Sequence, residues 1–425
     1  MYLDDLCACL VRLVRVLSSV KLIITLMKVL VVGGNFAGAT AALEIKRKLK
    51  GQAEVTLIDR NENFIYIPSL IWVPTKRREV SEIVVPRKNV LEKRGVNFVL
   101  DTATKVIPSE NKVITEKGEY SYDQLVIATG PKVKFDIAPG IKEHTCYIGT
   151  PPGAMDTRAK LEEFKKNPGS IVIGATQGAG CMGAAYEFLF NVEKWLREQN
   201  IREKVDLYWV TPEPFLGHFG IEGMPLGEEM LKKFMEMFHI HYRTGVGIKE
   251  VTEKSVILST GEEIASRFNM FMPPFIGVDF IANSPELNTP ANHFIPVLPS
   301  YRHETIPNIW AAGLTVDVKP PFQQGFVPFS VPKTGYPSDV SGKIVANNIV
   351  KTVRGESKME ELPWGKITGL CIMDAGKKEV IIFSNTLFKP RKFAVMIPNV
   401  IYDFGKVLLE KYFMWKLRNG LSYLP

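Results

Sequence analysis

Short apolar runs that end in glycine recur along this 425-residue chain. The first run, residues 28–32, leads through Gly33 into a helical stretch. A second run begins at Ile171 and leads through a glycine-rich turn to Cys181. A buried strand, a glycine-rich turn and a helix form the βα unit that cradles phosphate groups. The pattern therefore predicts an α/β protein with two Rossmann-like dinucleotide-binding domains.

The first unit has the spacing of a dinucleotide-binding turn. Its glycine pattern is GxGxxG with Asn35 at the middle glycine, and a second strand ends at Asp59. A carboxylate at that strand end accepts hydrogen bonds from a ribose. We therefore predict that six residues contact the dinucleotide: Gly33, Asn35, Phe36, Ala37, Gly38 and Asp59.

Two later strand ends indicate which dinucleotide is bound. One strand ends in Ala-Thr-Gly at residues 128–130, and another ends at Gly313. These ends resemble the recurring elements of flavoproteins with two dinucleotide-binding domains. We therefore expect FAD, with Thr129, Gly130 and Gly313 beside it. Leu314 stands where most of these flavoproteins have an aspartate.

The second unit differs from an NADH site in two ways. Cys181 stands where the helix begins, and a helix N-terminus favours the reactive thiolate. The alternative is that Cys181 is a small buried hydrophobic residue. The second strand, residues 205–211, has no acidic end, and Glu213 follows only after Pro212. We therefore expect that this unit does not bind NADH.

Composition narrows the class of protein further. Five cysteines are too few for a disulfide framework, and no Cys/His cluster has zinc spacing, so we expect no metal. Seven basic residues and two acidic ones lie between Leu387 and the C-terminus. Because this segment is also apolar, it favours a membrane surface over nucleic acid. No run of 18 apolar residues predicts a transmembrane helix.

Longer motifs resemble the sulfide:quinone oxidoreductase family over residues 27–421. The most specific matches are residues 179–187 around Cys181, 214–221, 331–336 and 410–420. The resemblance implies a membrane-associated FAD enzyme that oxidises hydrogen sulfide to polysulfide or sulfur and reduces a membrane quinone. It also leaves room for a homo-oligomer.

The resemblance implies a redox pair formed by Cys181 and Cys371. We favour Cys371 as the sulfur carrier and Cys181 as the thiolate on the flavin side. The third cysteine of many members aligns on Gly149, and a histidine of the family aligns on Gly153. Cys146 lies three residues before Gly149, and whether it substitutes is left open.

Two further side chains are candidates for catalysis. Glu187 follows Cys181 on the same helix and could transfer protons, and the alternative is a solvated helix face. His218 lies in the segment Gly-His-Phe-Gly, and the alternative for it is a hydrogen bond in the core.

A helix start near the flavin is the next candidate. Lys333, Thr334 and Gly335 follow a proline-rich segment and open a helix. A lysine and a helix N-terminus would stabilise an anionic reduced flavin. The alternative is an ordinary helix start with a solvated Lys333.

The C-terminal segment has apolar residues at helical steps of three and four: Ile401, Phe404, Leu408, Tyr412 and Trp415. Four basic residues line the rest of this helix: Lys406, Lys411, Lys416 and Arg418. Such a helix fits an interfacial membrane anchor, and the alternative is a core or dimer helix. The resemblance implies a quinone site formed by Leu370, Phe404, Lys406 and Leu409.

The predicted organisation has five segments: an N-terminal extension (1–26), the first part of the FAD-binding domain (27–145), the second Rossmann-like domain (146–292), the return part of the FAD-binding domain (293–355) and a C-terminal quinone- and membrane-binding domain (356–425). The extension could instead be an amphipathic anchor. Two rival functions remain, a type II NADH:quinone dehydrogenase of the same fold and a sulfide-sensing flavoprotein without turnover.

Overall fold

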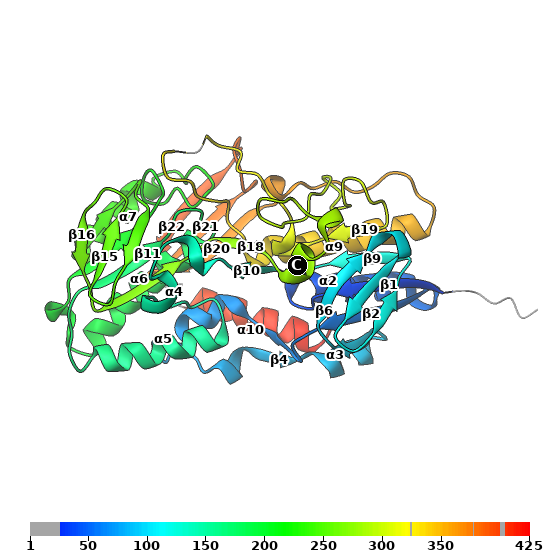
Figure 1. Ribbon diagram of the computed structural model, residues 1–425, viewed down its shortest axis with the longest axis horizontal. Helices are drawn as coiled ribbons and strands as arrows, with labels where there is room; N and C mark the ends of the chain where they lie inside the picture. Colours follow the sequence, from blue (N-terminus) through cyan, green and yellow to red (C-terminus); the bar gives the residue numbers. More distant parts are fainter. Residues whose placement is uncertain (1–25, 324, 377, 400–403) are drawn as a thin grey trace, which may run out of the picture.

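The computed structural model describes residues 26–323, 325–376, 378–399 and 404–425. The predicted extension therefore lies outside the described residues, apart from Leu26. Figure 1 shows an elongated molecule with one sheet toward each end and the C-terminal helix α10 (Gly405–Arg418) between them.

A parallel five-stranded sheet forms the first nucleotide-binding unit, in the order β19-β9-β1-β2-β5. Its strands are β1 (Met27–Val32), β2 (Ala53–Asp59), β5 (Asn97–Leu100), β9 (Gln124–Ile127) and β19 (Ile309–Ala311). Helix α2 (Phe36–Leu49) packs closely against helix α9 (Gly335–Val353). A Cβ added at Gly342 would overlap with the backbone of Ala37, so the two helices meet at glycine.

A second parallel sheet has the order β13-β12-β11-β17. Its strands are β11 (Ile171–Ala175), β12 (Leu207–Val210), β13 (Ile240–Arg243) and β17 (Phe268–Met272), and its helices are α5 (Pro151–Phe164), α6 (Met182–Glu198) and α7 (Gly227–Met237). Strand β11 is buried along its whole length, as expected for a central parallel strand. The two sheets confirm the predicted fold class.

An antiparallel sheet follows near the C-terminus, formed by β20 (Gly369–Asp374), β21 (Glu379–Ser384) and β22 (Ala394–Asn399). The remaining strands are short: β3 (Asn63–Ile65), β4 (Val84–Pro86), β6 (Ala103–Ile107), β7 (Lys112–Thr115), β8 (Glu119–Ser121), β10 (Pro131–Val133), β14 (Ile248–Val251), β15 (Ser255–Leu258), β16 (Glu263–Ala265) and β18 (Phe275–Gly277). The remaining α-helices are α3 (Arg87–Lys93), α4 (Ile141–His144) and α8 (Asp279–Ala282), and the 3-10 helices η2 (Ile67–Trp72) and η8 (Gly313–Thr315) lie near the site.

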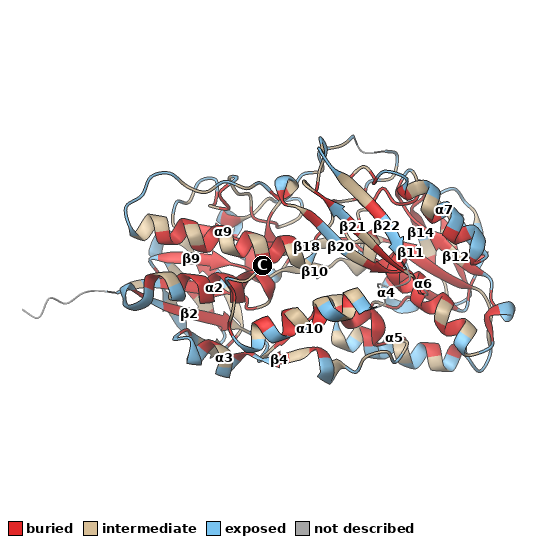
Figure 2. Ribbon diagram, turned by 180° about the vertical axis from the view of Figure 1, so that it is seen from behind, coloured by how far each residue is buried: buried red, intermediate tan, exposed pale blue. Residues whose placement is uncertain are grey.

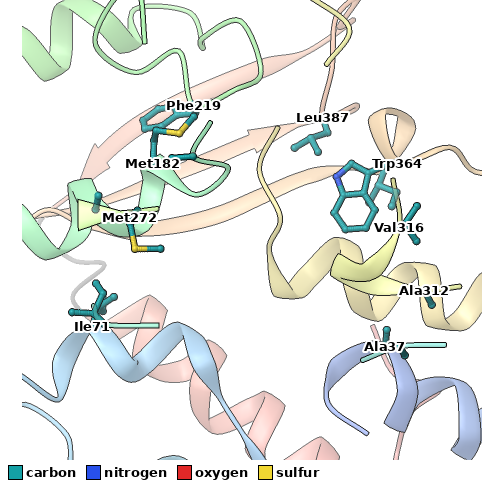
Figure 3. Close-up of a cluster of buried hydrophobic side chains, with 14 of the residues drawn as sticks. Ala37, Ile71, Met182, Phe219, Met272, Ala312, Val316, Trp364 and Leu387 are labelled. Carbon is teal, nitrogen blue, oxygen red and sulfur yellow. The ribbon is translucent and has the colours of Figure 1, made fainter. Parts of the chain in front are cut away.

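One continuous hydrophobic core joins these units. In Figure 3, Met182 and Phe219 come from the second unit, Ala37 and Ala312 come from the first, and Trp364 comes from the C-terminal part. All five side chains belong to the same buried cluster. The shared core fixes the units relative to one another, so residues far apart in sequence can form one site. The predicted domain boundaries remain predictions.

Candidate functional site

In the turn after β1, the backbone passes so close to neighbouring backbone atoms at two positions that only glycine fits. Gly33 has a φ of +92°, and a Cβ there would overlap with the backbone of Ala128. A Cβ at Gly38 would overlap with the carbonyl of Gly33. Asn35 is the N-cap of α2, and its buried Oδ1 has no hydrogen-bond partner among the described residues. No side chain caps α2, so its first amides face this tight turn as uncapped donors, as a phosphate site requires.

Asp59 lies at the end of β2 and turns toward this site. Its Oδ2 accepts a hydrogen bond from the Gly34 amide at 2.6 Å and pairs with the guanidinium of Arg87 at 3.0 Å. Arg87 also donates to the carbonyls of Asn61 and Asn63, at 2.8 and 2.9 Å. Arg87 was not predicted as a site residue, because no local motif in the sequence marks it. These residues fit the adenosine end of a dinucleotide.

The remaining predicted cofactor residues lie at the ends of neighbouring strands. Thr129 and Gly130 follow β9, and Gly130 and Gly313 have positive φ angles of +67° and +75°. The Gly313 amide donates to the hydroxyl of Ser341 at 2.9 Å. Parallel strands β9 and β19 are neighbours, so their carboxyl ends lie at one edge of the first sheet.

Lys333 is buried just before α9, which begins at Gly335 with Thr334 as its N-cap. Its ammonium donates to the carbonyls of Leu314 and Val316, at 3.0 and 2.7 Å. Burial lowers the pKa of Lys333 to about 7. The alternative of a solvated lysine is therefore wrong, because the fold takes this side chain out of water.

The glycine-rich turn after β11 is occupied by the chain itself. The Gly178 amide donates to the carbonyl of Pro328 at 2.6 Å, and the Ser330 amide donates to the carbonyl of Ala179 at 2.8 Å. The Lys333 amide donates to the carbonyl of Gly180 at 3.1 Å. The loop before α9 therefore packs across this turn and takes up the Gly178 amide, a donor that a pyrophosphate would need.

Glu213 is buried, and its carboxylate is hydrogen-bonded to groups of the protein itself. Its carboxylate accepts hydrogen bonds from the Tyr186 hydroxyl at 3.0 Å, the Thr211 hydroxyl at 2.9 Å and the Phe219 amide at 2.6 Å. Burial raises the pKa of Glu213 to about 7. The carboxyl group closest to the end of β12 therefore holds the following loop in place. This geometry agrees with the expectation that the second unit does not bind NADH.

His218 lies in that loop, enclosed by the rings of Phe215, Phe322 and Phe329. Burial, followed by the charges of Lys389 and Arg391, lowers the pKa of His218 to about 4. The ring is therefore neutral at pH 7. Its Nδ1 is buried and has no hydrogen-bond partner in the described part of the chain, so the alternative of a core hydrogen bond finds no support at this atom.

The fold places Cys181 and Cys371 on two elements that pack against each other. Cys181 is the N-cap of α6, Cys371 lies on β20, and both are free thiols. Burial is the main cause that raises the pKa of Cys371 to about 12, and the charges of Glu187 and Cys181 add to it. Cys371 nevertheless keeps solvent-accessible surface. Protein atoms therefore surround the Cys371 thiol but leave the residue accessible to solvent.

The expected effect of the helix N-terminus on Cys181 is wrong in direction. Burial raises the pKa of the Cys181 thiol to about 11, although a backbone hydrogen bond from Ala184 lowers it. At this position, the free-energy cost of removing a thiolate from water exceeds the stabilisation that one amide and the helix N-terminus provide. Cys146 is buried beside β17, and burial raises its pKa to about 12.

Glu187 is buried in α6 and forms an ion pair with Lys406 of α10. Burial raises the pKa of Glu187 to about 7, against the opposing effects of Lys406 and of the backbone of Asp374. The alternative of a solvated helix face is therefore wrong, because α10 and β20 cover this part of α6.

The segment around η2 contacts Lys406 and two further carboxylates, Asp374 and Glu410, and none of these contacts was predicted. The Trp72 indole donates to Asp374 at 2.8 Å, and the Lys406 ammonium lies 5.2 Å from the centre of the Trp72 ring. Ser69 donates to Glu410 at 2.6 Å. Arg77 pairs with Asp374 at 2.6 Å and Arg78 pairs with Glu410 at 3.2 Å. In the sequence these two arginines follow an apolar run, and that pattern does not identify their distant partners.

Helix α10 is oriented differently from the prediction. Lys406 and Lys416 are buried, and the Lys416 ammonium lies 3.0 Å from a carboxylate oxygen of Asp339. These lysines therefore do not line a solvated face, because carboxylates in the interior pair with them. Figure 2 shows that α10 has both buried and exposed positions. The exposed residues of the helix include apolar Leu408 and Trp415, and exposed Phe404 precedes them.

The predicted quinone residues lie on two neighbouring elements. Leu370 is exposed on β20, and Leu409 is half-buried on α10, which packs against β20. Ile401 lies outside the described residues. No helix within those residues is long and apolar enough to cross a membrane.

The chain matches known proteins along most of its length. The family model described as pyridine nucleotide-disulphide oxidoreductase covers residues 27–325. The sulfide-quinone reductase of Aquifex aeolicus is 32% identical over 92% of this chain and 91% of its own length. The structure of the sulfide:quinone oxidoreductase from A. aeolicus has a TM-score of 0.88 and covers 93% of this chain and 92% of that one, at 32% identity.

A type II NADH:quinone oxidoreductase of Staphylococcus aureus is 29% identical, but over only 37% of this chain and 42% of its own length. The resemblance to sulfide-quinone reductases is thus the more extensive of the two. The chain belongs to the sulfide-quinone reductase family of the pyridine nucleotide-disulphide oxidoreductases.

Proposed function

We propose that this protein is an FAD-dependent sulfide:quinone oxidoreductase that works with a membrane quinone. The observation that carries the proposal is that α6, with Cys181 at its start, packs against β20, which carries Cys371, and that α6 also holds the buried Glu187 paired with Lys406. The names of the relatives with extensive similarity supply the reaction class.

The cysteines would carry the sulfur chemistry. In the oxidised enzyme, hydrosulfide attacks a disulfide between Cys181 and Cys371, so one S–S bond breaks and another forms. One cysteine becomes a persulfide, and the other leaves as a thiolate that carries the electron pair onward. We assign the persulfide to Cys371, which keeps accessible surface, and the thiolate to Cys181.

FAD, held by the turn after β1, by Asp59 and by the ends of β9 and β19, supplies two-electron redox chemistry when bound. The protein contributes position and charge. Lys333 and the N-terminus of α9 would place positive potential beside the cofactor, because both lie near Gly313 in the first unit.

Quinone reduction requires two protons and a donor for the carbonyl. We place the quinone between Leu370, Phe404 and Leu409, with the Lys406 ammonium as the hydrogen-bond donor. Glu187 contacts Lys406, and its charge acts on both thiols, so it can move protons between the sulfur side and the quinone side.

Anaerobic titration tests the reaction class. Sulfide is expected to bleach the bound flavin, and added decylubiquinone is expected to restore its colour and to yield quinol. NADH is expected to leave the flavin oxidised, because residues 328–333 occupy the second turn. Bleaching by NADH and not by sulfide would support a dehydrogenase, and bleaching by sulfide without quinol would support a sensor.

We further propose that the exposed apolar side of α10 contacts a membrane surface. Leu408 and Trp415 are each 50% exposed, and basic Lys411 and Arg418 lie close to them. A Leu408→Glu/Trp415→Glu variant is expected to lose at least about tenfold in affinity for anionic lipid vesicles, because each side chain loses about 1.5–3 kcal/mol of burial. Sedimentation with vesicles measures this loss.

The matched control is Met237→Glu, on exposed α7 in the second unit. Met237→Glu is expected to bind vesicles as the unchanged protein does. If the control weakens binding as much as the double variant, the membrane surface is not the one proposed.

A further inference from the structure

Trp72, the last residue of η2, lies among buried charges next to the pair formed by Glu187 and Lys406. Three cations approach its ring, which is fully buried. The ring centre lies 4.4 Å from the guanidinium of Arg77, 5.0 Å from that of Arg78 and 5.2 Å from the ammonium of Lys406. The face of an aromatic ring carries negative potential and attracts a cation within about 6 Å. Trp72 therefore acts on the positions of these cations.

The three cations differ in how far they are removed from water. The side chains of Arg77 and Arg78 are 22% and 14% exposed, whereas that of Lys406 is only 5% exposed. An ammonium has three N–H donors. Among the described residues, the Lys406 ammonium donates one of them, to Glu187. Lys406 is therefore the cation that combines burial with donors left for a ligand.

The orientation of the Trp72 ring is fixed from its other edge. The indole N–H donates to Oδ2 of Asp374 at 2.8 Å, and the Gly376 amide donates to Oδ1 of the same carboxylate at 2.9 Å. The backbone of Asp374 also hydrogen-bonds to Glu187, and η2 packs against α6, which carries Glu187. The contacts of Trp72 thus lead through Asp374 and Glu187 back to Lys406.

An aromatic face suits an ammonium that has to donate elsewhere. It attracts the positive charge without accepting an N–H group in an ordinary hydrogen bond. A second carboxylate in the same place would take up another donor and cancel the charge. The Trp72 ring therefore holds the Lys406 ammonium and leaves its remaining donors for a carbonyl oxygen.

We propose that Trp72 is a positioning residue for quinone reduction: its ring holds the Lys406 ammonium where this group donates to the quinone carbonyl, and its N–H bond to Asp374 fixes the ring. The inference rests on the proposed role of Lys406 with the quinone. Trp72 acts through Lys406 and does not itself bind the quinone.

The test follows the oxidation of reduced flavin by decylubiquinone. The FAD-bound protein is reduced with one equivalent of sulfide and mixed anaerobically with a concentration series of the quinone in a stopped-flow instrument. The series separates the limiting rate from the half-saturating concentration. The variants are Trp72→Phe and Trp72→Leu, each alone and combined with Lys406→Met. The control is Trp195→Leu, which also removes a buried indole and lies on α6.

Trp72→Leu is expected to lower the limiting rate about tenfold, and Trp72→Phe only about threefold, because phenylalanine keeps an aromatic face. The half-saturating concentration is expected to stay within about twofold in both. When Lys406 is already methionine, Trp72→Leu is expected to change the rate by less than about twofold. Trp195→Leu is expected to leave the limiting rate within about twofold, and no variant is expected to slow bleaching by sulfide.

An undiminished rate in Trp72→Leu would overturn the proposal. Equal losses with and without Lys406, equal losses in the phenylalanine and leucine variants, or a change confined to the half-saturating concentration would also overturn it. Retained FAD absorbance shows that each variant is folded.

One further measurement separates this inference from the proposed function. If sulfide does not bleach the flavin, the proposed function fails, and reduction with dithionite still allows the role of Trp72 in quinone reduction to be measured. If the unchanged protein forms no quinol from either reductant, both proposals fail. If it forms quinol and the loss in Trp72→Leu does not depend on Lys406, only the inference fails.

Discussion

Replacing Cys371 with serine is expected to abolish the bleaching of the flavin by sulfide while leaving FAD bound. Serine cannot form the disulfide that hydrosulfide attacks, so no electron pair reaches the second cysteine. Cys371 lies on β20 and keeps solvent-accessible surface, so the smaller hydroxyl fits without a change in packing. Cys181→Ser is expected to have the same effect. Anaerobic stopped-flow absorbance measures the loss.

Cys146→Ser is the matched control for this prediction. Cys146 is buried beside β17, and its amide donates to the carbonyl of Asn269 at 2.8 Å. Its substitution is expected to leave the rate of bleaching within about threefold, because no interaction among the described residues links its thiol to Cys371. If Cys146→Ser is as damaging as Cys371→Ser, a third cysteine takes part in the sulfur transfer and the two-cysteine scheme is wrong.

Replacing Lys406 with methionine is expected to have the second large effect. The change leaves Glu187 buried without its cation, and breaking one partner of such a pair costs about 3–5 kcal/mol of unfolding free energy. Quinone reduction is expected to fall by at least about a hundredfold through loss of a charged donor. Bleaching by sulfide is expected to continue. Chemical denaturation and quinol formation measure the two effects separately.

Two variants separate the charge from the helix that carries it. Lys411→Met removes an exposed cation from the same helix and is expected to change neither stability nor turnover by a measurable amount. Lys406→Met combined with Glu187→Gln removes both charges, and it is expected to recover much of the stability but not the quinone reduction. Full recovery of turnover in the double variant would exclude a role for Lys406 with the quinone.

The same pair predicts a dependence of stability on pH. The pKa of Glu187 is about 7 in the folded protein and about 4.5 in the unfolded chain, so the folded state binds the proton more tightly. The stability that this group contributes is therefore present below about pH 4.5 and is lost as the pH rises to about 7. Glu187→Gln is expected to remove this part of the profile.

Local patterns in the sequence predicted much of the fold. Residues 28–38 and 171–183 predicted two strand–turn–helix units, and the structure has both. These predictions succeed because the alternation of buried strand, glycine turn and helix is determined over a few neighbouring residues. The positive φ of Gly33 and the tight approach at Gly38 are consequences of the same short-range geometry.

The predictions that failed concern burial. The sequence indicated a lowered pKa for Cys181 and a solvated Lys416. The structure instead buries Lys416, and partial burial of Cys181 raises the pKa of its thiol. Arg87 and Trp72 were missed because their partners are distant in the chain. Desolvation and ion pairing depend on which element covers a side chain. A local motif contains no information about that element, because it is distant in the sequence.

By itself, the sequence determined the two nucleotide-type units, the position of Cys181 at a helix start and the resemblance to one enzyme family. Only the tertiary structure decided that the strand of Cys371 packs against the helix of Cys181, that Lys406 turns inward to Glu187 and that residues 328–333 pack across the second turn. The reason is physical, because periodicity and turn geometry act between neighbours, whereas the charge state of a site depends on every segment that excludes water from it.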